Sequence, residues 1–281
     1  MGISNNGTVS IINFTIPVNI RHFEFTRFIV TICIRSPGFC DIDQVRQALG
    51  LQSINLWGGS YGTRAAMEYL RRYESRVRSV VLDGVAPPSM SLPESFARDA
   101  GQSLEKLFFA CAAQIQCSKQ YALFKPDLDQ LMAILARKPR SVRIADPVNG
   151  IARDVTVTRE KLMRAVFSTL YVPEMAAMLP AMLANARQGD YASLMAMSGV
   201  FSDSAEEKLA MGMQLSVVCA EDVPRINSSE QAAQPAPFGQ LFVGEFTKGC
   251  DVWPHGKMAA DFAQPVKSSK PVLILSGALD P

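Results

Sequence analysis

The chain has 281 residues and a formal net charge of +2, and its composition is 48% hydrophobic and 19% charged. This balance is typical of a folded globular protein and excludes an intrinsically disordered chain. The basic residues are scattered, which argues against a nucleic-acid surface, and no apolar run reaches the roughly 18–20 residues of a membrane-spanning helix. We therefore expect neither nucleic acid nor a membrane span.

The N-terminal segment, residues 1–40, has the least regular pattern and is treated as atypical. Residues 8–18 and 27–34 are rich in β-branched and aromatic side chains, so each is predicted to form a strand. Pro37-Gly38 then predicts a turn. The segment lacks the succession of basic region, apolar region and cleavage site that a signal peptide requires, so none is predicted.

An alternation of helix and strand patterns follows, typical of an α/β fold. The predicted elements are a helix over 41–49, a strand over 53–58, a helix over 60–73 and a strand over 77–85. Both strands are apolar without alternation, which predicts a mostly parallel sheet buried on both faces and flanked by helices.

The first of these helices has an N-cap candidate in Asp41 and a stop at Gly50. Its apolar residues, Ile42, Val45 and Leu49, recur on one face.

Strand patterns nearly disappear between residues 88 and 215. Amphipathic helices are predicted there over residues 95–115, 124–138, 158–171, 173–188 and 191–201. Only residues 141–158 indicate a β-hairpin, turning at Asn149-Gly150. Residues 270–281 then restore the pattern of a buried strand.

This change of pattern predicts a helical cap, residues 88–215, inserted into an α/β core. The core is divided between residues 41–87 and residues 216–281. We expect its sheet to be incomplete, because no further strand follows Pro281 in this chain.

A nucleophile elbow is predicted at Gly58-Gly59-Ser60-Tyr61-Gly62, which matches the pattern G-x-S-x-G between a strand and a helix. A serine on such a turn projects its Oγ clear of the sheet, and the small neighbours leave room for the turn. The N–H of Tyr61, at the start of the helix, is then placed to stabilise an oxyanion. Ser60 is therefore the candidate nucleophile.

A serine nucleophile needs a base and an acid that orients the base. Asp280 follows the last buried strand at its carboxyl end, where open α/β sheets place functional groups, and is the candidate acid. The two histidines, His22 and His255, both precede Asp280, and each is expected to be a loop or surface residue. No candidate base is therefore assigned.

Neither a metal nor an organic cofactor is expected. The six cysteines include no C-x-x-C pair, and two histidines are too few to suggest a zinc cluster. Buried free thiols and disulfides both remain open for these cysteines. If disulfides form, Cys111 and Cys117 are the most plausible local pair.

Four segments together resemble the tripeptidyl aminopeptidase and proline iminopeptidase group of α/β-hydrolases. They are "INLWGGSYGTRAAMEYLRRYESRVRSVVLDGVAPP", "FFACAAQIQC", "SVVCAEDVP" and "PVLILSGALDP". The resemblance covers about residues 41–281 and implies a serine exopeptidase that releases residues from the N-termini of peptides. It implies Ser60 as nucleophile, the Tyr61 N–H as oxyanion donor and Asp280 as the acid of the triad.

The resemblance also assigns four residues outside the elbow. Glu221 and Asp222 lie where the family places acidic residues near the free amine of the substrate, although an N-cap or a solvated acidic pair explains them equally. Cys219 and Cys250 resemble a family disulfide, as do Cys111 and Cys117, which favours an exported ancestor.

The chain departs from this family at both ends. The family carries a histidine after the strand that precedes Asp280, and an "HGGPG"-like stretch and a "DxRGxGxS" segment near its N-terminus; this sequence shows none of them. We therefore expect a C-terminally truncated hydrolase with impaired activity on peptides with a free N-terminus. A catalytically inactive fragment, a peptide-binding relative and an esterase are the alternatives.

Overall fold

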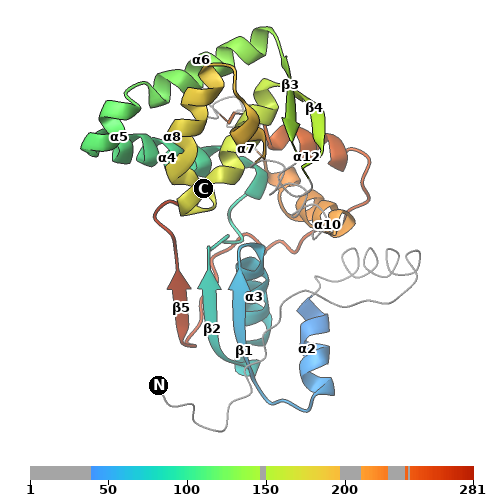
Figure 1. Ribbon diagram of the computed structural model, residues 1–281. Coiled ribbons are helices and arrows are strands. Elements are labelled where there is room, and N and C mark those ends of the chain that lie inside the picture. Colours follow the sequence, from blue (N-terminus) through green and yellow to red (C-terminus); the bar gives the residue numbers. More distant parts are fainter. Residues whose placement is uncertain (1–38, 146–149, 197–209, 227–237, 240) are drawn as a thin grey trace. The chain divides into compact units, whose positions relative to one another are not determined.

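The computed structural model describes residues 39–145, 150–196, 210–226, 238–239 and 241–281 (Figure 1). The chain divides into two compact units. The first comprises residues up to Pro93, Gly212–Ile226 and Phe246–Gly277, and the second comprises Glu94–Met211, Asn227–Glu245 and Ala278–Pro281. The strands predicted over 8–18 and 27–34 lie outside the described residues, as do residues 197–201 of the last predicted helix.

A three-stranded parallel sheet forms the centre of the first unit (Figure 1). Its strands are β1 (Ile54–Gly59), β2 (Val77–Asp83) and β5 (Val272–Leu275), in the order β1-β2-β5. The register sets Trp57 beside Val81 and Val81 beside Leu273. The carboxyl ends of all three strands therefore lie at one edge of the sheet, where Ser60 follows β1. These strands confirm the predicted parallel α/β core.

One face of this sheet packs against α3 (Tyr61–Tyr73). Buried apolar residues of the strands and the helix meet there: Ile54, Leu56, Ala66, Tyr69, Leu70, Val77, Val80 and Leu82. The predicted burial of both faces is wrong for the described sheet, because Trp57 on the opposite face is 50% exposed. Strand β5 at the edge is exposed on both faces, from 41% to 62%.

The remaining helical segments of the first unit are short. They are α2 (Phe39–Ala48), η1 (Glu74–Arg76), α10 (Met211–Glu221), η2 (Val223–Arg225) and α12 (Val243–Cys250). Boundaries between the units fall within α10, after Met211, and within α12, after Glu245. Helix α2 begins two residues before the predicted N-cap, so Asp41 lies inside the helix and not at its start. Gly50 follows the helix with a φ of +66°, in keeping with the predicted stop.

The buried face of α2 is polar, which the apolar pattern of this helix did not predict. Asp43 and Arg46 form an ion pair of 2.6 Å, and Tyr69 donates a hydrogen bond of 2.9 Å to the same carboxylate. The hydrogen bond from Arg46 lowers the pKa of Asp43 to about 2. Val45 and Leu49, expected on the inner face, are 56% and 64% exposed. The opposite charges of Asp43 and Arg46 neutralise each other inside the unit. This ion pair occupies the face of α2 that was expected to pack apolar side chains.

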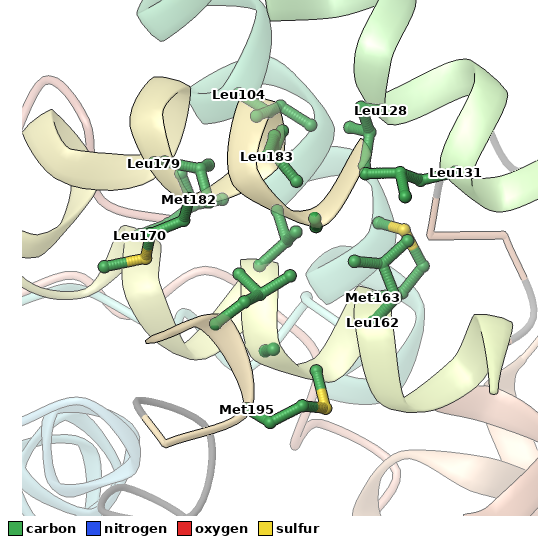
Figure 2. Packing of buried hydrophobic residues seen from close by; sticks show 14 of the residues in the cluster. Leu104, Leu128, Leu131, Leu162, Met163, Leu170, Leu179, Met182, Leu183 and Met195 are labelled. Carbon is green, nitrogen blue, oxygen red and sulfur yellow. The ribbon is translucent and has the colours of Figure 1, made fainter. Parts of the chain in front are cut away.

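Helices dominate the second unit. Among the described residues they include α4 (Leu92–Ala113), which begins in the first unit, α5 (Ile115–Gln120), α6 (Phe124–Arg137), α7 (Arg159–Leu170) and α8 (Pro173–Arg187), and residues 192–196 are also helical. The predicted hairpin is confirmed by β3 (Arg140–Ala145) and β4 (Ala152–Val157), which pair antiparallel. Figure 2 shows the leucines and methionines that α4, α6, α7 and α8 bury between them. Met163 and Met182 are therefore core residues, whereas Met178 of α8 is 54% exposed.

Among the described residues, two disulfides join helices, one in each unit. Cys111–Cys117 joins α4 to α5 in the second unit, and Cys219–Cys250 joins α10 to α12 in the first. Within the part of the chain that the structure describes, no helix combines the length and the apolar character needed to cross a bilayer.

Candidate active site

Ser60 occupies a sharp corner between β1 and α3. Its φ of +53° and ψ of −124° lie in a backbone region that residues other than glycine rarely adopt. No other non-glycine residue among those described has a positive φ. Such a conformation costs roughly 1–3 kcal/mol and persists only where surrounding contacts impose it. The Ser60 residue is also exposed. The strained, exposed serine is what a nucleophile elbow requires.

Backbone hydrogen bonds hold this corner on both sides. The Ser60 N–H donates to the carbonyl of Asp83 at the end of β2, at 2.9 Å. The Ser60 carbonyl accepts from the N–H and the hydroxyl of Thr63, at 2.9 and 2.7 Å. The Thr63 hydroxyl oxygen also accepts from the N–H of Ala86, at 2.9 Å. The elbow is thus joined directly to β2 and to the segment that follows it.

The two outer glycines of the motif have different roles. A Cβ at Gly58 would overlap the carbonyl group of Gly62 and approach the N–H of Thr63 to 2.7 Å. A Cβ at Gly59 or at Gly62 would meet no atom within 4 Å. The close passage of strand and helix backbones therefore requires glycine at position 58 only.

Asp280 lies five residues after β5, in the part of the chain that belongs to the second unit. There α4 holds the preceding backbone: Ser103 Oγ donates to the Leu279 carbonyl at 2.7 Å, and Lys106 Nζ donates to the Ala278 carbonyl at 2.6 Å. Desolvation, and then the negative charge of Asp280, raise the pKa of Tyr171 to about 12. Ser60 belongs to the first unit, so the pairing of these two residues stays a prediction.

His255 lies on an exposed loop, as the sequence predicted. Its Nδ1 is 3.0 Å from the carbonyl oxygen of Trp253. His22 lies outside the described residues. The described geometry therefore assigns no base to Ser60.

The predicted acidic pair belongs to a buried ionic cluster in the first unit. Arg64, on the first turn of α3, donates from Nη1 to Asp222 at 2.9 Å and to Glu221 at 3.2 Å. Arg64 and Asp222 are fully buried and Glu221 is 6% exposed. Asp222 Oδ1 also accepts from the N–H of Leu92, at 3.1 Å. The carboxylates are therefore tied to α3 and not solvated.

Tyr61 joins this cluster through its hydroxyl, which donates to Glu221 Oε1 at 2.9 Å. Burial raises the pKa of Glu221 to about 7, with the charge of Asp222 adding to it, while Arg64 and the Tyr61 hydroxyl act in the opposite direction. Burial and the charge of Glu221 raise the pKa of Tyr61 well above its ordinary value. Tyr61 is thus a neutral donor, and Glu221 titrates near neutral pH.

Sequence reasoning missed Arg64 and the hydroxyl of Tyr61. A clue existed, because Arg64 follows Ser60 by four residues and stands beside the buried Ala65 and Ala66. A cation on a helix face that packs into a core needs a carboxylate partner. The pattern does not reveal that the partners lie more than 150 residues later in the chain.

Comparison with known proteins agrees with this architecture. A family model for the alpha/beta hydrolase fold matches residues 40–110, which include β1, the elbow and β2. This stretch of the chain has the alpha/beta hydrolase fold. It is also 24% identical over 263 residues to the serine protease Hip1 of Mycobacterium tuberculosis and of Mycobacterium bovis, which covers 86% of this chain. Over 45 residues it is 47% identical to the putative hydrolase YuaR of Escherichia coli, covering 16% of this chain and 9% of that protein.

These similarities are to a hydrolase fold family and to serine proteases. The match to the mycobacterial proteases covers 49% of their length, so the chain spans about half of these curated relatives. Among the described residues, no group of three or more His, Cys, Asp and Glu side chains gathers in a way that could hold a metal ion.

Proposed function

We propose that this α/β-hydrolase is a serine peptidase that releases residues from the N-termini of peptides. The observation that carries the serine chemistry is the positive φ of exposed Ser60 at the corner between β1 and α3. Support for a peptide substrate comes from the resemblance to aminopeptidases and from the similarity to the mycobacterial serine proteases.

In the proposed reaction, Ser60 Oγ forms a bond to the carbonyl carbon of the substrate while a base accepts its proton. The Tyr61 N–H stabilises the oxyanion, and Asp280 orients the base. The C–N bond then breaks, the leaving amine takes the proton, and water releases the acid from the acyl-enzyme. No residue of this chain is assigned as the base.

A helical cap is part of the same proposal. We infer that the predicted cap, residues 88–215, limits the length of peptide that the enzyme accepts. Amine recognition by Glu221 and Asp222 has weaker support, because Arg64 already contacts both carboxylates and Asp222 is fully buried. This arrangement leaves an ester as a second candidate substrate, since an ester needs no ligand for a free amine.

A fluorophosphonate probe tests the serine chemistry, because it bonds covalently to an activated serine and carries no amine. We expect the 281-residue chain to be labelled at Ser60 and the Ser60→Ala variant to remain unlabelled, with peptide mapping to identify the site. Absence of labelling in the parent chain would support the alternative of an inactive, peptide-binding relative.

Three substrates with the same acyl group separate the peptidase from the esterase: a peptide with a free N-terminus, its N-acetylated form and an ester. Faster hydrolysis of the free peptide than of the acetylated one is expected for an aminopeptidase. Turnover of the ester alone would overturn the peptidase assignment.

A further inference from the structure

The side chain of the residue next to the nucleophile is anchored to a distant helix. Tyr61 follows Ser60, and its hydroxyl donates to Glu221 at the end of α10, 160 residues later. The backbone N–H of the same Tyr61 is the proposed oxyanion donor. The anchored side chain and the donor N–H are therefore joined through a single Cα atom.

Both oxygens of Glu221 are already engaged inside the cluster. Oε1 accepts from Tyr61 at 2.9 Å, and Oε2 accepts from Arg64 at 3.2 Å. The guanidinium of Arg64 also lies 5.9 Å from the centre of the Tyr61 ring, within the range of a cation–π contact. A substrate ammonium would have to displace Tyr61 or Arg64 from Glu221. A role of Glu221 in holding Tyr61 requires no such displacement.

Arg64 links the first turn of α3 to two further segments. Its Nη2 donates to the carbonyls of Met90 and Pro87, at 2.7 and 3.4 Å, in the segment after β2. On the other side, Arg225 Nε donates to the Glu221 carbonyl at 2.5 Å. The end of α10 is therefore fixed from several directions and forms a firm support for Tyr61.

The strained corner needs such a support. Hydrogen bonds to Asp83 and Thr63 hold the backbone of Ser60 and, through its carbonyl, the peptide plane that also carries the Tyr61 N–H. The hydroxyl of Tyr61 adds a second constraint, which acts from the side chain on the other end of this peptide unit. We propose that Glu221 is a positioning residue, which orients the oxyanion donor of Tyr61 through the tyrosine hydroxyl and does not bind the substrate amine. This inference rests on the proposed function, because it takes the Tyr61 N–H as the donor.

The rate of fluorophosphonate labelling tests the inference, because the probe needs an oriented oxyanion donor but offers no amine. Tyr61→Phe and Glu221→Ala should each slow labelling by about tenfold or more, within the range expected when a catalytic group is misplaced by a fraction of an ångström to 1 Å. Glu221→Gln keeps an acceptor for the hydroxyl and should restore most of the rate. Amine binding by Glu221 instead predicts parent rates for all three variants, which would overturn the proposal.

Tyr69→Phe is the matched control. Tyr69 lies on the same helix, and its hydroxyl donates to Asp43 at 2.9 Å, away from the elbow. The same atom is removed from a buried hydrogen bond to a carboxylate, so both tyrosine variants share the cost of that loss. Equal slowing in Tyr69→Phe and Tyr61→Phe would show a general effect on folding and contradict a positioning role.

A second measurement separates failure of this inference from failure of the proposed function. If the parent chain is not labelled, the proposed function fails, and hydrogen exchange of the Ser60 and Thr63 amides still tests the positioning. These amides should exchange faster in Tyr61→Phe than in the parent and Tyr69→Phe chains. Unchanged exchange in Tyr61→Phe would overturn the inference, and this variant suffices if Glu221→Ala does not fold.

Discussion

At the scale of single residues, the absence of a Cβ atom at Gly58 permits the backbone conformation of Ser60 at the elbow. Gly58 lets β1 pass so close to the first turn of α3 that any Cβ there would overlap the Gly62 carbonyl. Ser60 can hold its positive φ because the neighbouring backbone is fixed by this contact and by the hydrogen bond to Asp83. Reactivity at Ser60 thus depends on a residue that performs no chemistry.

We predict that Gly58→Ala destabilises the protein by roughly 2–3 kcal/mol, since relieving the overlap must shift backbone rather than a flexible side chain. Gly62→Ala is the matched control. Its Cβ meets no atom within 4 Å, and alanine favours a helix over glycine by up to about 1 kcal/mol. Chemical unfolding of both variants measures the difference. Equal stability in the two would contradict the assigned roles.

The raised pKa of Glu221 has a consequence for stability. A carboxyl whose pKa rises from 4.5 to about 7 on folding binds its proton more tightly in the folded state. Its contribution to stability is therefore fully present below pH 4.5 and is lost as the pH rises through about 7. The size of the effect is at most about 3 kcal/mol.

We predict that the free energy of unfolding of the parent chain falls, relative to that of Glu221→Gln, between pH 4.5 and 7. The glutamine cannot ionise but still accepts a hydrogen bond from Tyr61. Denaturant unfolding at several pH values in this window measures the difference, and titration of other groups cancels between the two chains. A constant difference across the window would show that Glu221 titrates normally.

At the scale of elements, the local patterns predicted most of the chain. The strands β1, β2 and β5, helix α3 and the β3–β4 hairpin lie where the apolar runs and turn residues indicated. The patterns failed where charge is buried. Asp43 and Arg46 of α2 form a buried pair. Arg64 meets Glu221 at the end of α10 and Asp222 directly after it, and no local periodicity records these contacts.

The two disulfides should differ in their effect on stability. Cys219–Cys250 closes a loop with a sequence separation of 31 and Cys111–Cys117 one with a separation of 6. The entropy of closing these loops in the unfolded chain predicts losses of about 4 and about 2 kcal/mol on removal. Paired Cys→Ser variants, unfolded under identical conditions, measure each loss. A larger loss for the shorter loop would show that native packing decides the effect.

The longer disulfide also bears on the site. Cys219 lies two residues before Glu221, so the bridge to α12 holds the end of α10 that carries the acidic cluster. Loss of this bridge should therefore slow fluorophosphonate labelling of Ser60 in a chain that remains folded. Loss of Cys111–Cys117, which joins α4 and α5, serves as the control and should leave labelling unchanged.

At the scale of the whole molecule, the sheet of the first unit has an exposed strand at its edge among the described residues. Sequence predicted β5 as a buried strand, because four apolar residues without alternation are typical of one covered on both faces. In the described structure β5 forms hydrogen bonds with β2 along one edge only, and all four of its residues are exposed. The apolar composition of a strand indicates that it is suited to burial. It does not indicate whether a neighbouring element covers it.

An exposed apolar edge strand templates pairing with other chains, so we predict that the protein associates through β5. Ile274 is the most exposed residue of this strand, at 62%, and Ile274→Lys should raise the soluble fraction without lowering stability. Val80→Lys is the contrasting control, because Val80 on β2 is 1% exposed and a buried lysine should unfold the unit. Light scattering at increasing concentration measures association, and thermal unfolding measures stability. Undiminished association of a folded Ile274→Lys chain would place the contact on another surface.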